Sequence, residues 1–257
     1  MKLLIQCDDY GITKGQAAGV IEGIKNGLIK NTGFFVNMSW SEEVFKIIQP
    51  YLSDIAFGLD LNLSTGSPVS NSKDIPSLVQ SNGEFLTSSM HRQLDKENDN
   101  NCHVNYEDAY RELKAQIKRY IDLVGDTPDY LHAHAYVGEQ ITKASIELSK
   151  EYNIPYSMQL IKEKNIFSPE TSWYMEMRTK AQKDIDVVDY IINDKLDILD
   201  KDIVFLITHG GYVDAELYKL SSFNDIRAKD LEMLTSKAVF EWIEINNIEL
   251  ITYHSFK

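Results

Sequence analysis

Aspartate and histidine side chains lie at or near the ends of four short apolar runs of the sequence, and as a set they could bind a metal ion and move protons. They are Asp8, Asp9, Asp60, His134 and His209. Carboxylates and imidazoles together bind a divalent cation, and a cation with open positions activates water for hydrolysis. A carboxylate that is not a ligand can accept the proton of that water, and an imidazolium can protonate the departing group. The residue types therefore indicate metal-assisted hydrolysis of a small acyl group.

Each of these residues taken alone also has a structural explanation. An Asp-Asp pair after a strand commonly forms a turn or caps a helix, and His132 and His134 could be hydrogen-bonded loop residues. Asp60 resists such an explanation, because it interrupts the apolar run 58–63 and a buried carboxylate needs a cation or several donors. The remaining histidines lack comparable neighbours and are interpreted as surface or structural residues: His91, His103 and His254.

The strands that precede the candidate residues must end close together for this chemistry to work. Apolar runs typical of buried strands cover residues 2–7, 33–38, 55–63, 130–134, 154–158, 202–208 and 248–252. Helical periodicity or capping is found over 15–25, 41–48, 106–124, 142–152, 185–199 and 229–246. Alternating strands and helices predict a parallel sheet whose carboxyl ends share one face. We predict an α/β fold, a distorted (β/α) barrel like the TIM barrel, forming a single domain over residues 1–257.

The composition excludes several classes of partner. The sequence has 39 Asp and Glu against 26 Lys and Arg, a net charge of −13, which repels the phosphates of nucleic acids. No apolar run reaches the roughly 20 residues that span a bilayer. The first residues turn acidic too early for a secretory signal, and two cysteines are too few for a disulfide framework. We expect a cytoplasmic protein without nucleic-acid or membrane partners, and the sequence leaves a homodimer open.

Several blocks of the sequence resemble one family. Residues 6–11, Gln-Cys-Asp-Asp-Tyr-Gly, resemble the Asn-Ala-Asp-Asp-Phe-Gly opening of the YdjC-like carbohydrate deacetylases, which include the chitooligosaccharide deacetylases. The likeness continues over residues 12–15, 26–32, 58–66, 131–134 and 208–210, and so covers most of the chain. The opening block is the most specific of these motifs.

The resemblance implies a distorted (β/α) barrel that removes N-acetyl groups from amino sugars or oligosaccharides with one divalent metal ion. In the family pattern Asp8 matches the general base, Asp9 the metal-binding aspartate and His134 a histidine ligand. His209 matches a histidine for which the resemblance implies a role as acid or transition-state stabiliser. Asp60 stands where the family usually has a metal-binding histidine.

The sequence departs from the family pattern at and near this metal site. With Asp60 the ligand set has two carboxylates and one imidazole, which favours Mg²⁺, with Mn²⁺ or Zn²⁺ as alternatives. His132 stands where the family usually has Asp, Tyr136 where it often has another His, and Gly210 where it usually has Pro. These changes fit either a retuned enzyme or a catalytically silent sugar-binding protein of the same fold.

A glycosidase or phosphoesterase is a third reading. Asp8 and Asp9 are too close together for the acid pair of a glycosidase, although Asp60 could be a distant partner. No Gly-rich phosphate cradle and no basic cluster follows the strands. The loops 64–69, 70–104 and 161–180 would select an acetylated sugar, and the last contains Trp173 and Tyr174, whose rings could stack on a sugar or pack in the loop.

Overall fold

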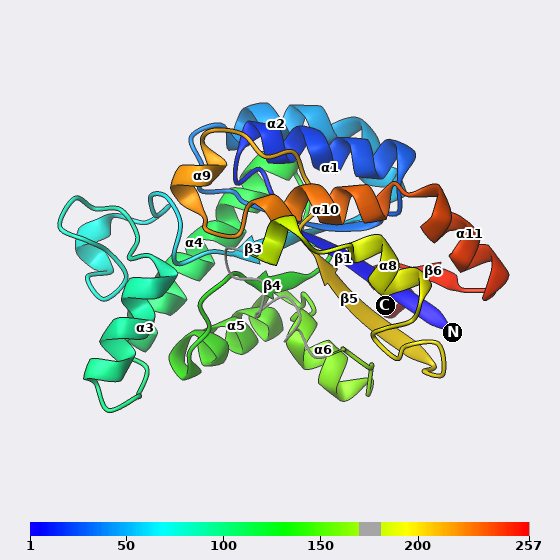
Figure 1. Cartoon of the computed structure of the whole chain (residues 1–257). Coiled ribbons are helices and arrows are strands. Elements are labelled where there is room, and N and C mark those ends of the chain that lie inside the picture. Colours follow the sequence, from blue (N-terminus) through cyan, green and yellow to red (C-terminus); the bar gives the residue numbers. More distant parts are fainter. Residues whose placement is uncertain (170–180, 257) are drawn as a thin grey trace.

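A parallel sheet of six strands runs through the centre of the computed structural model, which describes residues 1–169 and 181–256 (Figure 1). The strands are β1 (Lys2–Tyr10), β2 (Asn31–Phe34), β3 (Ala56–Leu61), β4 (Leu131–Ala133), β5 (Ile203–Thr208) and β6 (Glu249–Ile251). Their order is β4-β3-β2-β1-β5, with β6 also paired to β1. All five pairings are parallel, so the predicted α/β class is confirmed.

The sheet does not close into the predicted barrel. Where closure would need further strands between β4 and β5, the described residues form single bridges, Leu131 with Tyr156 and Phe167 with Val204. The strand predicted over 154–158 is wrong, because helix α6 (Ser157–Glu163) begins directly after the bridge at Tyr156. The backbone hydrogen bonds that would have paired another strand are used within that helix instead.

Helices lie around the sheet, and α1, α2 and α5 pack into one apolar core with it. In Figure 1, α1, α2 and α10 lie above the sheet, and α5 and α6 lie below it. Among the described residues, the α-helices longer than one turn are α1 (Lys14–Asn26), α2 (Ser41–Ile48), α3 (Ser88–Glu97), α4 (Tyr106–Val124), α5 (Glu139–Tyr152), α6, α8 (Val187–Ile192), α10 (Asp225–Leu234) and α11 (Lys237–Ile245). The short α9 (Leu217–Leu220) precedes α10. None of the described helices is long and apolar enough to cross a membrane.

Two of the predicted helices differ from the structure. The helix predicted over 185–199 is limited to α8, and the one predicted over 229–246 is divided between α10 and α11. The division falls at Thr235, which follows the last residue of α10, and Ser236 is the N-cap of α11.

The two faces of the sheet are packed differently, as the two-residue period of a strand requires. Most apolar side chains pack between the sheet and the helices, in a core that contains Phe34 and Phe57 with ring centroids 5.3 Å apart. The other face, here called the inner face, carries a smaller cluster in which Tyr130 stacks on Tyr253 at 3.9 Å. The inner-face side chain that follows Tyr130 along β4 is His132.

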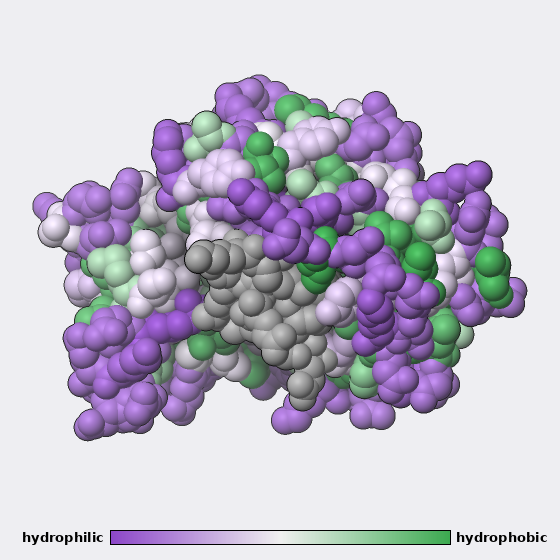
Figure 2. All heavy atoms as spheres, viewed as in Figure 1, coloured by the Kyte–Doolittle hydropathy of each residue, from purple (hydrophilic) through white to green (hydrophobic). Residues whose placement is uncertain are grey.

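The surface view in Figure 2 shows mostly hydrophilic residues, with hydrophobic ones in small separate groups. This distribution fits a chain with a net charge of −13, whose charged side chains must remain in contact with water.

We predict that Gly58→Ala destabilises the inner face. A Cβ atom at this position would lie 2.5 Å from ring atoms of Tyr130, which are held by the stack on Tyr253. Overpacking of this kind costs about 1–3 kcal/mol, measurable as a lower midpoint of urea unfolding. In a Tyr130→Leu background the same substitution should cost much less, and an equal cost in both backgrounds would show that the ring is not the obstacle.

Candidate active site

An irregularity in β1 places the two adjacent aspartates. Cys7 pairs with Thr32 and Tyr10 with Phe34, so β1 has one residue more than β2 between the pairs. Asp9 accommodates the extra residue with a left-handed backbone, φ 71°. A bulge of this kind redirects side chains at the end of a strand, and here it turns the carboxylates of Asp8 and Asp9 toward different neighbours.

Asp9 is the residue on which three other site residues converge. Its side chain is fully buried, with Oδ1 2.8 Å from His134 Nδ1 and Oδ2 2.6 Å from Arg227 Nη2. Its backbone N–H donates to Asp60 Oδ2 at 2.6 Å. The structure thus brings the three predicted metal ligands, Asp9, Asp60 and His134, into one place.

Asp8 lies between two imidazoles. Its Oδ2 is 3.4 Å from His132 Nε2 and 4.0 Å from His209 Nε2, while Oδ1 accepts a hydrogen bond from Gln6 Nε2 at 2.5 Å. A proton taken up by this carboxylate would therefore have two nearby ring nitrogens as acceptors. Asp8 and His209, the two predicted catalytic residues, lie side by side.

A surrounding layer of side chains orients these groups. His132 Nδ1 lies 2.7 Å from Ser157 Oγ, so the first residue of α6 supports the site. The Tyr253 hydroxyl donates to Gln6 Oε1, and the backbone N–H of His209 donates to Asp230 Oδ2 at 2.7 Å. These supports fix the imidazoles and Gln6 around Asp8.

Burial and neighbouring charge shift the pKa values of the site in different directions. Burial, followed by the charge of Asp9, raises the pKa of Asp8 well above its ordinary value, and burial with the charges of Asp8 and Asp9 does the same for Asp60. Burial would also raise the pKa of Asp9, but the charges of His134 and Arg227 outweigh it and hold this pKa well below its ordinary value. Asp9 is therefore the ionised carboxylate of the group.

The imidazoles next to Asp8 are neutral at pH 7 in this arrangement. Burial lowers the pKa of His132 to about 4 and that of His209 to about 3. His209 therefore holds no proton to donate in the resting protein and must first receive one from a neighbour.

The donor atoms suit a hard divalent cation, although they do not form a complete metal site. Among the described residues Asp60 Oδ1 is buried without a hydrogen-bond partner, and Asp9 Oδ1 lies 2.8 Å from His134 Nδ1. Within the described residues, no group of three or more His, Cys, Asp or Glu side chains is arranged to hold a metal ion. Asp60 Oδ1 instead lies over Gly33, where an added Cβ would be 1.9 Å away.

Sequence reasoning missed Arg227, whose guanidinium contacts Asp9. Arg227 lies in α10 and follows no strand, so the search along strand ends could not find it. A charge argument could have suggested it, because several buried carboxylates need a cation nearby. Ser157 was missed because a strand was predicted there.

Tyr136 points away from the site. Its hydroxyl donates to Asp95 Oδ2 at 2.7 Å, and its ring stacks on His91 at 4.3 Å. His91 Nε2 in turn lies 2.9 Å from the Leu63 carbonyl oxygen and donates to it. These contacts fit the interpretation of His91 as a structural residue, and the stack ties the segment 69–104 to the loop that follows His134.

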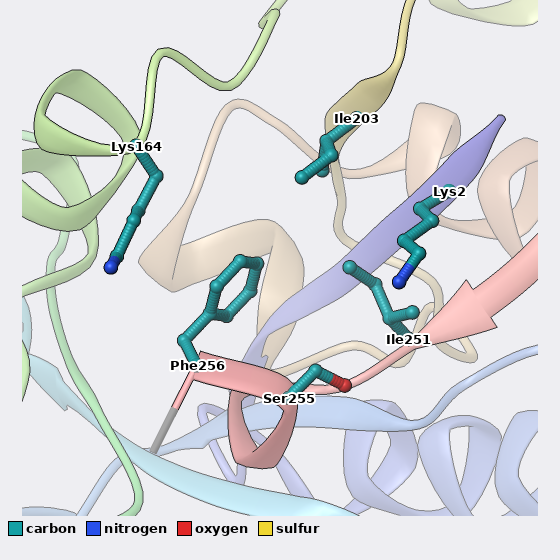
Figure 3. A pocket seen from close by; sticks show the side chains of 6 residues that line it. All are labelled: Lys2, Lys164, Ile203, Ile251, Ser255 and Phe256. Atoms are coloured by element: carbon teal, nitrogen blue, oxygen red, sulfur yellow. The ribbon is translucent and has the colours of Figure 1, made fainter.

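The predicted substrate-selecting loops are only partly visible. Trp173 and Tyr174 lie outside the described residues. A pocket of about 430 Å³ lies elsewhere, beside the first residues of β1 and β5 (Figure 3). Its walls are Lys2, Lys164, Ile203, Ile251, Ser255 and Phe256. None of the candidate site residues lines it.

We predict that Asp60→Asn stabilises the metal-free protein at high pH only. Because the pKa of Asp60 is raised on folding, the folded state binds more protons than the unfolded state between the ordinary pKa, about 4, and the raised one. The wild-type protein therefore loses stability as pH rises through this window, whereas the Asn variant has no such loss.

In EDTA at pH 8, Asp60→Asn should melt above the wild type by about 2–4 °C for each 1 kcal/mol of unfolding free energy that the wild type loses in this window. At pH 4 the two melting temperatures should be nearly equal. Asp122→Asn, at an exposed position of α4, serves as the control. A gain of the same size at both pH values, or a loss at pH 8, would contradict the charge argument.

Comparisons with known proteins agree with the motif resemblance. The model of the family described as YdjC-like protein matches residues 2–245. Carbohydrate deacetylase from Clostridium beijerinckii is 31% identical over 98% of this chain and 99% of its own. Carbohydrate deacetylase 2 from Listeria innocua is 30% identical over 99% and 98%.

Solved structures show the same fold. A putative cellobiose-phosphate cleavage protein from Enterococcus faecalis superimposes with a TM-score of 0.79, at 23% identity over 99% of this chain and 98% of the other. A polysaccharide deacetylase from Bacillus cereus has a TM-score of 0.51, at 12% identity over 100% and 93%. With the family model spanning nearly the whole sequence, the chain belongs to the YdjC-like protein family.

Proposed function

We propose that this protein is a metal-dependent hydrolase that removes N-acetyl groups from acetylated amino sugars or oligosaccharides. The observation that supports it most is the position of Asp8, a buried carboxylate 3.4 Å from His132 and 4.0 Å from His209, next to the cluster around Asp9. The names of the relatives, carbohydrate deacetylases at 30–31% identity, support the same substrate class. A cytoplasmic location is part of the proposal.

In this proposal Asp9, Asp60 and His134 hold one divalent cation, which would activate water and offset the negative charge on the acyl oxygen. Two carboxylates with one imidazole favour Mg²⁺, with Mn²⁺ and Zn²⁺ as alternatives.

Asp8 and His209 move the proton. Asp8 accepts it from the attacking water, since a carboxylate of raised pKa is a stronger base than an exposed one. His209 is neutral at rest and its Nε2 lies 4.0 Å from Asp8, too far for a direct hydrogen bond, so it protonates the departing nitrogen only after the proton from water has reached it. His132, anchored by Ser157, keeps Asp8 in place.

A catalytically silent sugar-binding protein is the second candidate. The observation that favours it is that both carboxylate oxygens of Asp9 already face a nitrogen, His134 Nδ1 and Arg227 Nη2. The described residues also contain no complete three-ligand group.

Asp8→Asn should reduce acetate release from acetylated amino sugars by about 10²–10⁴-fold, the usual contribution of a general base. Bound metal should stay unchanged, because Asp8 is not a proposed ligand. Acetate is measured enzymatically, and the far-ultraviolet circular dichroism of the variant verifies its fold. Acetate release equal to that of the wild type would remove Asp8 from the mechanism.

Metal content distinguishes the two candidates. After stripping and reloading with Mg²⁺ or Mn²⁺, elemental analysis should find about one ion per wild-type chain, and much less in Asp9→Ala and Asp60→Ala, because each loses an anionic ligand. Glu97→Ala, at an exposed position of α3, is the control. A wild-type protein that takes up no metal but binds saccharides would favour the silent protein.

A further inference from the structure

Arg227 is a buried cation that reaches the site from a distant part of the chain. It lies in α10, is 1% exposed, and contacts Asp9, which is 218 positions away in the sequence. A buried guanidinium is costly unless it is paired and hydrogen-bonded. Interactions at the site must therefore compensate for the burial of this side chain.

The orientation of the guanidinium is fixed by Phe223, which lies two residues before the start of α10. Nε donates to the Phe223 carbonyl at 2.8 Å, and the guanidinium carbon lies 5.9 Å from the centroid of the Phe223 ring. Nη2 is left to donate to Asp9 Oδ2 at 2.6 Å, and Nη1 is buried without a hydrogen-bond partner among the described residues. The guanidinium of Arg227 is thus held in one orientation next to the Asp9 carboxylate.

Helix α10 is itself tied to the strand end that carries His209. The Arg227 carbonyl accepts from Gly211 N–H at 3.2 Å, and Asp230, one turn later, accepts the His209 N–H at 2.7 Å. The position of Arg227 relative to the site is therefore set from both its side chain and its backbone.

Arg227 also supplies positive charge to a site that is rich in carboxylates. Of the lysines and arginines in residues 1–169 and 181–256, Arg227 alone forms a salt bridge with Asp8, Asp9 or Asp60. Full ionisation of three carboxylates opposite one guanidinium leaves two negative charges, which one divalent ion would neutralise.

We propose that Arg227 is a positioning residue that fixes the Asp9 carboxylate and supplies the positive charge that lets this site contain Asp60 as well. Asp60 and Arg227 both act on Asp9, the first through its backbone N–H and the second through its side chain. This inference rests on the proposed function only where it concerns catalysis, since the charge balance exists in the metal-free protein.

The first test is the stability of the metal-free protein in EDTA. Arg227→Ala should lower the melting temperature by about 10 °C, because it leaves buried carboxylates without their cation. Asp60→Asn added to Arg227→Ala should recover about half of this loss, since it removes one of those charges. Arg119→Ala is the matched control, because Arg119 donates to the Val36 carbonyl and forms no salt bridge among the described residues.

Chemical rescue separates charge from packing. Guanidinium ion at tens of millimolar should raise the melting temperature of Arg227→Ala relative to wild type, whereas urea, which has the same shape without the charge, should not. Equal losses in Arg227→Ala and Arg119→Ala, no recovery from Asp60→Asn, or equal rescue by urea would each overturn the proposal.

Two further variants cover the case in which Arg227→Ala does not fold. Arg227→Lys and Arg227→Gln both lose the guanidinium, but only the second loses the charge. The Lys variant should melt at least several degrees higher than the Gln variant, and equal melting temperatures would overturn the role of charge.

Activity measurements test whether Arg227 positions the Asp9 carboxylate for catalysis. In the metal-loaded protein, Arg227→Ala should lower kcat by about 10²-fold, the usual cost of a displaced site group, with KM little changed. Guanidinium should partly restore kcat. If the wild type releases no acetate, the proposed function fails, whereas the stability tests still decide the role of Arg227.

Discussion

The burial of three carboxylates in one place is the constraint on which the rest of this structure depends. The aspartates at the ends of β1 and β3 are at most 5% exposed, and an uncompensated buried charge costs several kcal/mol. His132 and His209 do not supply positive charge at pH 7, because burial lowers the pKa of the first to about 4 and of the second to about 3. In the described part of the chain, Arg227 alone among lysines and arginines pairs with these aspartates. The site therefore needs further positive charge or bound protons.

Three local departures from regular α/β geometry place the groups that meet this constraint. The bulge in β1 separates the two adjacent aspartates, so that Asp9 faces Arg227 and Asp8 faces the imidazoles. The start of α6 at Ser157, where the sheet stops short of closure, supplies the partner of His132. Helix α10 supplies Arg227. The irregular elements thus carry as much of the site as the regular strands.

Features that depend on the periodicity of apolar residues could be predicted from the sequence. Features that depend on the contacts of a single residue could not. The apolar runs located β1, β3, β4 and β5, and parallel strands place their carboxyl ends on one edge, so the meeting of Asp9, Asp60 and His134 could be predicted. Closure of the barrel could not, because an apolar run such as 154–158 fits a strand as well as the bridge and helix found there. Arg227 could not be predicted because it lies in α10 and follows no strand, so the rule that parallel strand ends meet does not place it.

The departures from the family pattern differ in what they mean for activity. Tyr136 faces Asp95 and His91, outside the site, so its identity bears on the anchoring of the segment 69–104. Asp60 and His132 lie in the site, one on the Asp9 backbone and the other beside Asp8. A site without a cation to bind would gain stability by exchanging buried carboxylates for neutral groups of similar volume. In this chain a carboxylate, Asp60, stands where the family resemblance leads one to expect a histidine, and it contacts the backbone of Asp9, whose side chain pairs with Arg227. The added carboxylate raises the cost of a site without a metal ion, which favours the proposed cation over a silent pocket.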